Sequence, residues 1–226
     1  MTSQKFDHYL VVDFETTGLS PGYRPLEIAW LEFDTDFNVI ESVESLINPQ
    51  MDIEPGAEKV HGISAGMVAT APTLDEFIKT HHGDKFRESN VLIVAHNAKF
   101  DFPMFAPYCG HAAQLCTMML GLKLYPNSSS HQLGVLAKLV GVEKEPTHRA
   151  LDDVETCFAL LQHYSVANTL SIDGLIKLAQ SFDGDSTMPF GKHKGTKIKD
   201  LPSDYASWLA KTLEPDHWVV QILKTL

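Results

Sequence analysis

The stretch HYLVVDFETTGL, residues 8–19, decides the fold and raises the first question about function. Its apolar run at 9–12 predicts a buried strand that leads directly into Asp13 and Glu15. Because side chains alternate along a strand, the two carboxylates are expected on one face, roughly 6–7 Å apart. Like charges at the end of a core strand repel each other and lose hydration, so the pair requires a compensating partner.

The segments that follow predict a sheet that begins with antiparallel strands. Residues 25–34 and 39–49 read as strands joined by a turn, and the continuous apolar run at 90–97 reads as a buried strand. Residues 114–120 fit either a strand or a short helix. Capping and periodicity predict helices at residues 73–82, 131–141 and 148–165. This order predicts an α/β fold, with helices on the faces of a mixed sheet.

The composition is that of a soluble globular protein. The 226 residues are 44% hydrophobic and 21% charged. We expect a main domain at residues 1–168, a helix and linker at 169–187, and a small element at 188–226. No apolar run approaches about 18 residues and no leader segment is evident, so no membrane association is expected. The three cysteines form no CxxC pair, which favours reduced thiols and a cytoplasmic location.

The net charge of −11 argues against a broad grip on duplex DNA through lysine and arginine. It does not exclude nucleic acid as a partner. A protein that meets phosphate through bound metal ions needs carboxylates at its site, and these add to the negative charge.

Two further motifs carry acidic side chains. AHNAKFDF places Asp101 just after a buried strand, where the dipole of a following helix alone could explain it. HRALDDVET places His148 before the clearest helix, with Asp152 and Asp153 on it. Asp153 lies nearer the buried stripe of that helix, and Asp152 is expected to be more solvated. Each motif alone fits ordinary surface chemistry, but the ordered set predicts a site.

The three motifs together resemble a known family. DFETTGL, HNAKFDFPMF and HRALDD are similar to the exonuclease motifs of the DEDD superfamily, in its histidine-containing DEDDh branch. The family's spacing of His, four residues and Asp selects Asp153 over Asp152. The resemblance covers roughly residues 7–165. The tail MPFGKHKGTKIKDLP resembles an extension found in the exodeoxyribonuclease X subfamily.

This resemblance implies a ribonuclease H-like fold, with a mixed five-stranded sheet flanked by helices and a small C-terminal extension. It implies 3′–5′ hydrolysis of phosphodiester bonds at DNA 3′ ends, releasing nucleoside 5′-monophosphates in DNA repair or proofreading. His148 would take the proton from the attacking water. Two Mg²⁺ or Mn²⁺ ions would be held by four carboxylates, with Asp13 bridging both ions. The implied ligands are Asp13, Glu15, Asp101 and Asp153.

Substrate contacts are also implied. The backbone around Thr16 and the apolar side chain of Leu19 would hold the 3′-terminal nucleotide. Four further residues are candidates, of which Phe14 also fits a core side chain on the opposite face of its strand. These candidates are Phe14, His61, Asn97 and Phe100.

Several alternatives stay open at this point. An exoribonuclease of the same fold would differ by contacts to a 2′-hydroxyl, which one sequence does not reveal. A non-catalytic nucleic-acid-binding module is a second alternative. Whether the protein associates with a polymerase or forms a homodimer is also open. The acidic balance favours single-stranded 3′ ends as substrate.

The basic tail has two interpretations. Its four lysines, at 192, 194, 197 and 199, either touch phosphates or belong to a solvated hairpin. We expect Trp208 and Trp218 to pack in a small satellite core.

Overall fold

The computed structural model describes residues 5–19, 22–82 and 84–226. Its centre is a five-stranded sheet with the strand order β3-β2-β1-β4-β5. β1 pairs antiparallel with β2, and β2 with β3, whereas β1, β4 and β5 run parallel. The strands are β1 His8–Thr16, β2 Pro25–Phe33, β3 Val39–Leu46, β4 Asn90–Ala95 and β5 His111–Cys116. The predicted mixed five-stranded sheet is confirmed.

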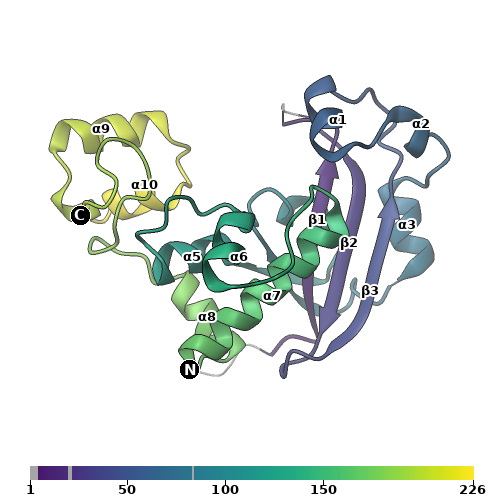
Figure 1. Cartoon of the computed structure of the whole chain (residues 1–226), viewed down its shortest axis with the longest axis horizontal. Coiled ribbons are helices and arrows are strands. Elements are labelled where there is room, and N and C mark those ends of the chain that lie inside the picture. The colour runs from purple at the N-terminus through teal and green to yellow at the C-terminus, as the bar shows by residue number, and fades with distance from the viewer. Residues whose placement is uncertain (1–4, 20–21, 83) are drawn as a thin grey trace.

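Helices cover both faces of this sheet and also form a separate C-terminal lobe. Figure 1 shows α7 crossing β1 and β2, which it contacts, and the helices α9 and α10 set apart in yellow. The α-helices of the main part are α1 Pro55–His61, α2 Ala65–Val68, α3 Leu74–His81, α4 Phe102–Phe105, α5 Thr117–Leu124, α6 Leu133–Val140, α7 Ala150–Asn168 and α8 Ile172–Ala179. The C-terminal lobe carries α9 Ser203–Thr212 and α10 Trp218–Leu223. Two short 3₁₀ helices span Ala106–Tyr108 and Ile198–Asp200. None of the helices among the described residues is long and apolar enough to cross a membrane.

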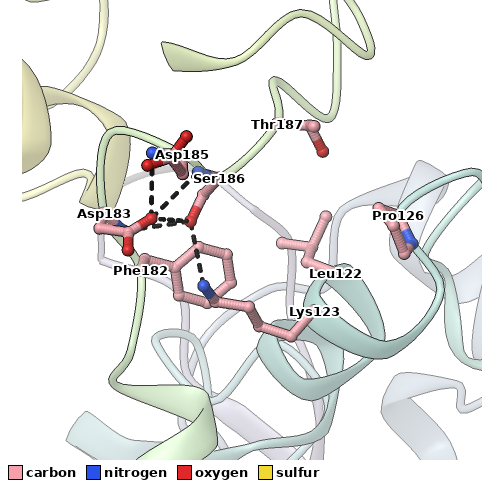
Figure 2. A pocket seen from close by; sticks show the side chains of 8 residues that line it. All are labelled: Leu122, Lys123, Pro126, Phe182, Asp183, Asp185, Ser186 and Thr187. Atoms are coloured by element: carbon pink, nitrogen blue, oxygen red, sulfur yellow. Dashed lines mark hydrogen bonds between the residues drawn. The ribbon is translucent and has the colours of Figure 1, made fainter. Parts of the chain in front are cut away.

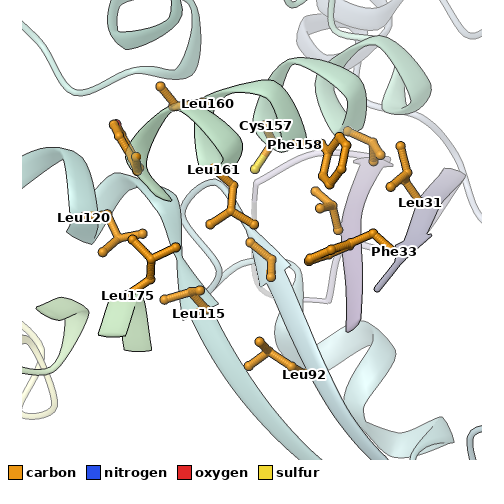
Figure 3. Packing of buried hydrophobic residues seen from close by; sticks show 14 of the residues in the cluster. Leu31, Phe33, Leu92, Leu115, Leu120, Cys157, Phe158, Leu160, Leu161 and Leu175 are labelled. Atoms are coloured by element: carbon orange, nitrogen blue, oxygen red, sulfur yellow. The ribbon is translucent and has the colours of Figure 1, made fainter. Parts of the chain in front are cut away.

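The alternation of β1 assigns its side chains to two cores. Leu10 and Val12 pack with α3 and α4, while Val11 belongs to the core under α7. Figure 3 shows Phe158 and Leu161 pointing from α7 toward the sheet, where the ring of Phe33 lies 5.1 Å from that of Phe158. The face of β1 that continues from Val11 therefore lies beneath α7.

Two segments differ in detail from the sequence prediction. The stretch 114–120 contains both alternatives, because β5 ends at Cys116 and α5 begins at Thr117. The helix predicted from residue 148 begins at Ala150 instead. His148 has a left-handed backbone, with φ of 58°, and Arg149 is extended.

The lysines of the tail are largely held by the protein itself. Lys197 and Lys199 pair with Asp185 at 2.8 and 2.7 Å, and Lys194 donates to the backbone carbonyls of Ser128 and Ser129. These contacts favour the hairpin interpretation for three of the four lysines.

A small core supports the tail. It is built from Met188, Ile198, Leu209, Val219 and Ile222, and Trp218 packs against it as expected. Trp208 does not: it is 52% exposed and stacks on Tyr205, because its position on α9 points away from this core.

The linker into this lobe is anchored on α5. Lys123 donates to the Ser186 hydroxyl at 3.0 Å and to the Ser181 carbonyl at 2.9 Å, and Figure 2 shows it pointing toward Ser186. Asp183 accepts from the backbone N–H of Ser186, which closes the turn. The adjoining cavity of about 340 Å³ is lined by none of the predicted site residues.

Candidate active site

Asp13 and Glu15 lie on the face of β1 that α7 covers. They continue the alternation from Val11, whereas Phe14 points into the opposite core. β1 is the central strand and runs parallel to β4, so the carboxyl ends of both strands meet at one edge of the sheet. The chain places Asp101 six residues after the end of β4, at this same edge.

Asp101 does not act as a helix cap. Its side chain makes no capping hydrogen bond at α4, although it stands directly before that helix. Its Oδ1 instead accepts from the backbone N–H of Phe14 at 3.2 Å, and the residue is only 2% exposed. This contact holds the Asp101 carboxylate against β1 at Phe14, the residue that separates Asp13 from Glu15 in the sequence.

The third motif completes the cluster. One ligand atom each from Glu15, His148 and Asp153 lies within 4.8 Å of the others. The left-handed backbone of His148 turns its side chain toward these carboxylates, and Asp153 accepts from the backbone N–H of Thr147 at 3.0 Å. Asp152 turns away to pair with Lys144 at 2.8 Å. The structure thus groups Asp153, rather than Asp152, with Glu15.

A buried ion pair fixes this helix start, and the sequence analysis missed it. Glu27 on β2 is fully buried, lies opposite Glu15 in the strand register, and accepts from Arg149 Nε at 3.1 Å to each oxygen. Arg149 Nη2 and the backbone N–H of Ala150 also donate to Glu27. A carboxylate within the apolar strand segment PLEIAWLEF was the available signal. The pair holds the start of α7, and with it Asp153, against the sheet.

The cluster is electrostatically strained without a cation. Burial raises the pKa of each carboxyl, most strongly at Asp13 and Asp101, which also repel neighbouring carboxylates. The pKa of Glu15 rises to about 7, first through burial and then through Asp153 and Glu27, while Arg149 opposes the shift. Burial raises the pKa of Asp153 as well. In each case the protein disfavours the charged carboxylate.

This donor set fits a hard divalent cation. Carboxylate oxygens are the ligands that Mg²⁺ and Mn²⁺ prefer, and a cation among them would offset both the repulsion and the lost hydration. Asp13, Glu15, Asp101 and Asp153 are the residues that would hold it. Surface carboxylates in general lack this combination of burial, mutual repulsion and close spacing.

The predicted substrate contacts occupy two kinds of position. Leu19 is 83% exposed, and Asn97 is exposed with a left-handed backbone, φ 66°. Phe100 is half-buried and stacks on Tyr23, with ring centroids 4.8 Å apart. These side chains can meet a ligand.

The other three predicted contacts are buried. The Phe14 side chain packs in the core under α3 and α4, which corrects the prediction that it touches substrate, because alternation points it away from the cluster. Thr16 donates its hydroxyl to the Gly18 carbonyl at 2.9 Å. His61 is 6% exposed, and its Nδ1 accepts from the backbone N–H of Ile63; burial lowers its pKa.

Comparison with known proteins agrees with this geometry. The Exonuclease family model, RNase_T, matches residues 10–161. The chain belongs to this exonuclease family, in its DEDDh branch of 3′–5′ exonucleases. A second model, "Putative quorum-sensing-regulated virulence factor", matches residues 173–226.

Individual relatives extend the likeness beyond the catalytic part. Exodeoxyribonuclease 10 of Escherichia coli K12 is 27% identical over 211 residues, covering 90% of this chain and 91% of the relative. A solved structure of exonuclease X in complex with 5′ overhanging duplex DNA has a TM-score of 0.61 and 26% identity, covering 76% of this chain and 99% of that one. The PolC-type DNA polymerase III of Clostridium perfringens is 30% identical over 165 residues, which are 69% of this chain and 11% of the polymerase.

Proposed function

We propose that this exonuclease is a metal-dependent 3′–5′ exodeoxyribonuclease that releases nucleoside 5′-monophosphates from DNA 3′ ends. The observation that carries the proposal is the convergence of four carboxyls and His148 at one edge of the sheet. A role in DNA repair or proofreading and a cytoplasmic location are part of the proposal. The described cysteines, all free thiols, are compatible with that location.

DNA is proposed as substrate because of the relatives. Exodeoxyribonuclease 10 aligns along nearly the whole chain, and the exonuclease X structure contains DNA with an overhanging end. An open strand end suits the acidic catalytic part, which has few cations to grip duplex phosphates.

The protein groups divide the chemistry among them. Bound Mg²⁺ or Mn²⁺, two ions in the proposed site, would neutralise charge on the phosphate and lower the pKa of a bound water. Asp13, Glu15, Asp101 and Asp153 supply the oxygens that hold the ions. His148, exposed at the rim of the cluster, takes the proton of the attacking water.

The substrate is positioned for an in-line displacement. The water oxygen bonds to phosphorus, the bond from phosphorus to the 3′-oxygen of the preceding nucleotide breaks, and that oxygen takes up a proton. The released product is a nucleoside 5′-monophosphate. The exposed Leu19 side chain offers the terminal base an apolar surface.

Digestion of matched oligonucleotides tests this proposal. Single strands of DNA and of RNA with one sequence, labelled at the 5′ end, are incubated with the purified chain in Mg²⁺ or in EDTA. We expect a ladder shortening from the 3′ end of DNA in Mg²⁺ alone. Faster loss of RNA would make the protein an exoribonuclease. No Mg²⁺-dependent shortening of any 3′ end would refute the enzyme proposal, unless activity appears when a polymerase partner is added.

A further inference from the structure

A cavity of about 390 Å³ lies between the sheet edge that carries the carboxylates and the C-terminal lobe. Its sheet side is formed by Asn97, just after β4, and by Cys116 at the end of β5, which pairs with the last residue of β4. Its far side is formed by the start of α10. Asn97 and Lys99 stand four and two residues before Asp101, so the segment that carries Asp101 also forms part of the cavity wall. Its volume is within the range of ligand pockets, about 300–1,000 Å³.

The lining combines apolar surface with a cation. Met118 and Met119 on α5 and Trp218 on α10 supply the apolar part, and Lys99 supplies the cation. Trp218 packs against Phe182, with ring centroids 4.3 Å apart. Aromatic and thioether side chains favour flat π-systems, and an ammonium group favours phosphate.

The charge distribution agrees with an anionic occupant on the lobe side. Residues 188–226 contain six lysines and four carboxylates, a net charge of +2. Residues 1–187 carry −13. The lobe is therefore much less acidic than the rest of the chain, although Asp185, just before it, pairs with Lys197 and Lys199.

We propose that this cavity holds nucleotides of the substrate strand that precede the 3′-terminal one, with a base against Trp218 and Met119 and a phosphate at Lys99. This inference rests on the proposed function and deepens it, because it assigns the C-terminal lobe a role in gripping the strand. The Exonuclease family model ends at residue 161, so it does not include α10.

An ion pair at the cavity determines whether a substitution should strengthen or weaken strand binding. Lys99 Nζ lies 2.9 Å from Asp216 Oδ1, and both side chains are well exposed. A phosphate at Lys99 must compete with this carboxylate and is repelled by it. Removing the Asp216 charge is therefore expected to strengthen strand binding, whereas a purely structural link between lobe and sheet would make its removal neutral or harmful.

Strand affinity is measured by fluorescence anisotropy with a 5′-labelled 12-nucleotide single strand of DNA in Ca²⁺ at fixed ionic strength. We expect Asp216→Ala to lower the Kd about threefold, the effect of one unit charge some 7 Å away in water. Asp204→Ala removes an exposed carboxylate from the same lobe, outside the cavity lining, and is the matched control.

Lys99→Ala is expected to raise the Kd about threefold, while Lys211→Ala, which removes an exposed lysine of the lobe outside the cavity lining, is its control and leaves the Kd within error. An unchanged or raised Kd for Asp216→Ala, or an equal fall for Asp204→Ala, would overturn the proposal. Digestion of the same strand by the unmodified protein in Mg²⁺ separates the two claims. If the unmodified protein digests the strand but Asp216→Ala leaves the Kd unchanged, only the proposal for the cavity is overturned. If the unmodified protein does not digest the strand, the proposed function is refuted.

Discussion

Replacing Glu15 with glutamine is expected to stabilise the metal-free protein at pH 8 while abolishing its activity. The reason is the pKa of Glu15, which burial raises from 4.5 to about 7. A folded-state pKa above the unfolded value means that the folded protein binds the proton more tightly. The associated stability is fully present below pH 4.5 and is lost as pH rises through 7.

The magnitude follows from the size of the shift. Raising the pKa from 4.5 to about 7 corresponds to about 3 kcal/mol of unfolding free energy lost at pH 8. Glutamine has the same shape without the charge, so Glu15→Gln should recover most of this loss. For a chain of this size, about 3 kcal/mol raises Tm by about 6–12 °C.

Thermal unfolding followed by circular dichroism in EDTA at pH 5 and pH 8 measures the effect. The Tm of the variant should be well above that of the unmodified protein at pH 8, and close to it at pH 5. Asp152→Asn is the matched control. Lys144 and Thr147 lower the pKa of Asp152, so the charge of Asp152 stabilises the folded protein and its removal should not raise Tm at pH 8. A Tm difference for Glu15→Gln that is equal at both pH values, or a lower Tm at pH 8, would refute the reasoning.

Three further predictions concern the same edge of the sheet. Asp13→Asn should lower the rate of DNA digestion by at least about a hundredfold without lowering Tm in EDTA at pH 8, since burial disfavours the Asp13 charge; a lower Tm would contradict this. Glu27→Ala should cost roughly 3 kcal/mol in urea unfolding and reduce activity, because it leaves Arg149 without its buried partner; unchanged stability would show that the pair does not hold α7. Asp153→Asn should inactivate digestion, while Asp152→Asn should retain it with a stability change under about 1 kcal/mol; equal losses would argue against the choice of Asp153.

Local patterns predicted the sheet and the cluster well. Alternation along residues 8–19 correctly placed Asp13 and Glu15 on one face, because the buried strand has a fixed register. Helical geometry and family spacing together selected Asp153, which the structure groups with Glu15 and His148. The strand and helix arguments need only neighbouring residues, and the family spacing added the choice of Asp153.

Contacts between segments far apart in the chain were harder to predict from the sequence. Glu27 and Arg149 are 122 residues apart, and nothing local pairs them. The exposed position of Trp208 likewise depends on which face of α9 meets the small C-terminal core. The division of 114–120 at Cys116 follows from pairing with β4, a long-range constraint that propensity does not contain.

Anomalous diffraction from crystals grown with Mn²⁺ and a nucleoside 5′-monophosphate tests the central claim most directly. The account predicts two Mn²⁺ peaks against the carboxylates of Asp13, Glu15, Asp101 and Asp153, with the nucleotide phosphate beside them and His148 at its edge. A nucleotide bound without Mn²⁺ at these carboxylates, or Mn²⁺ held elsewhere on the chain, would contradict it.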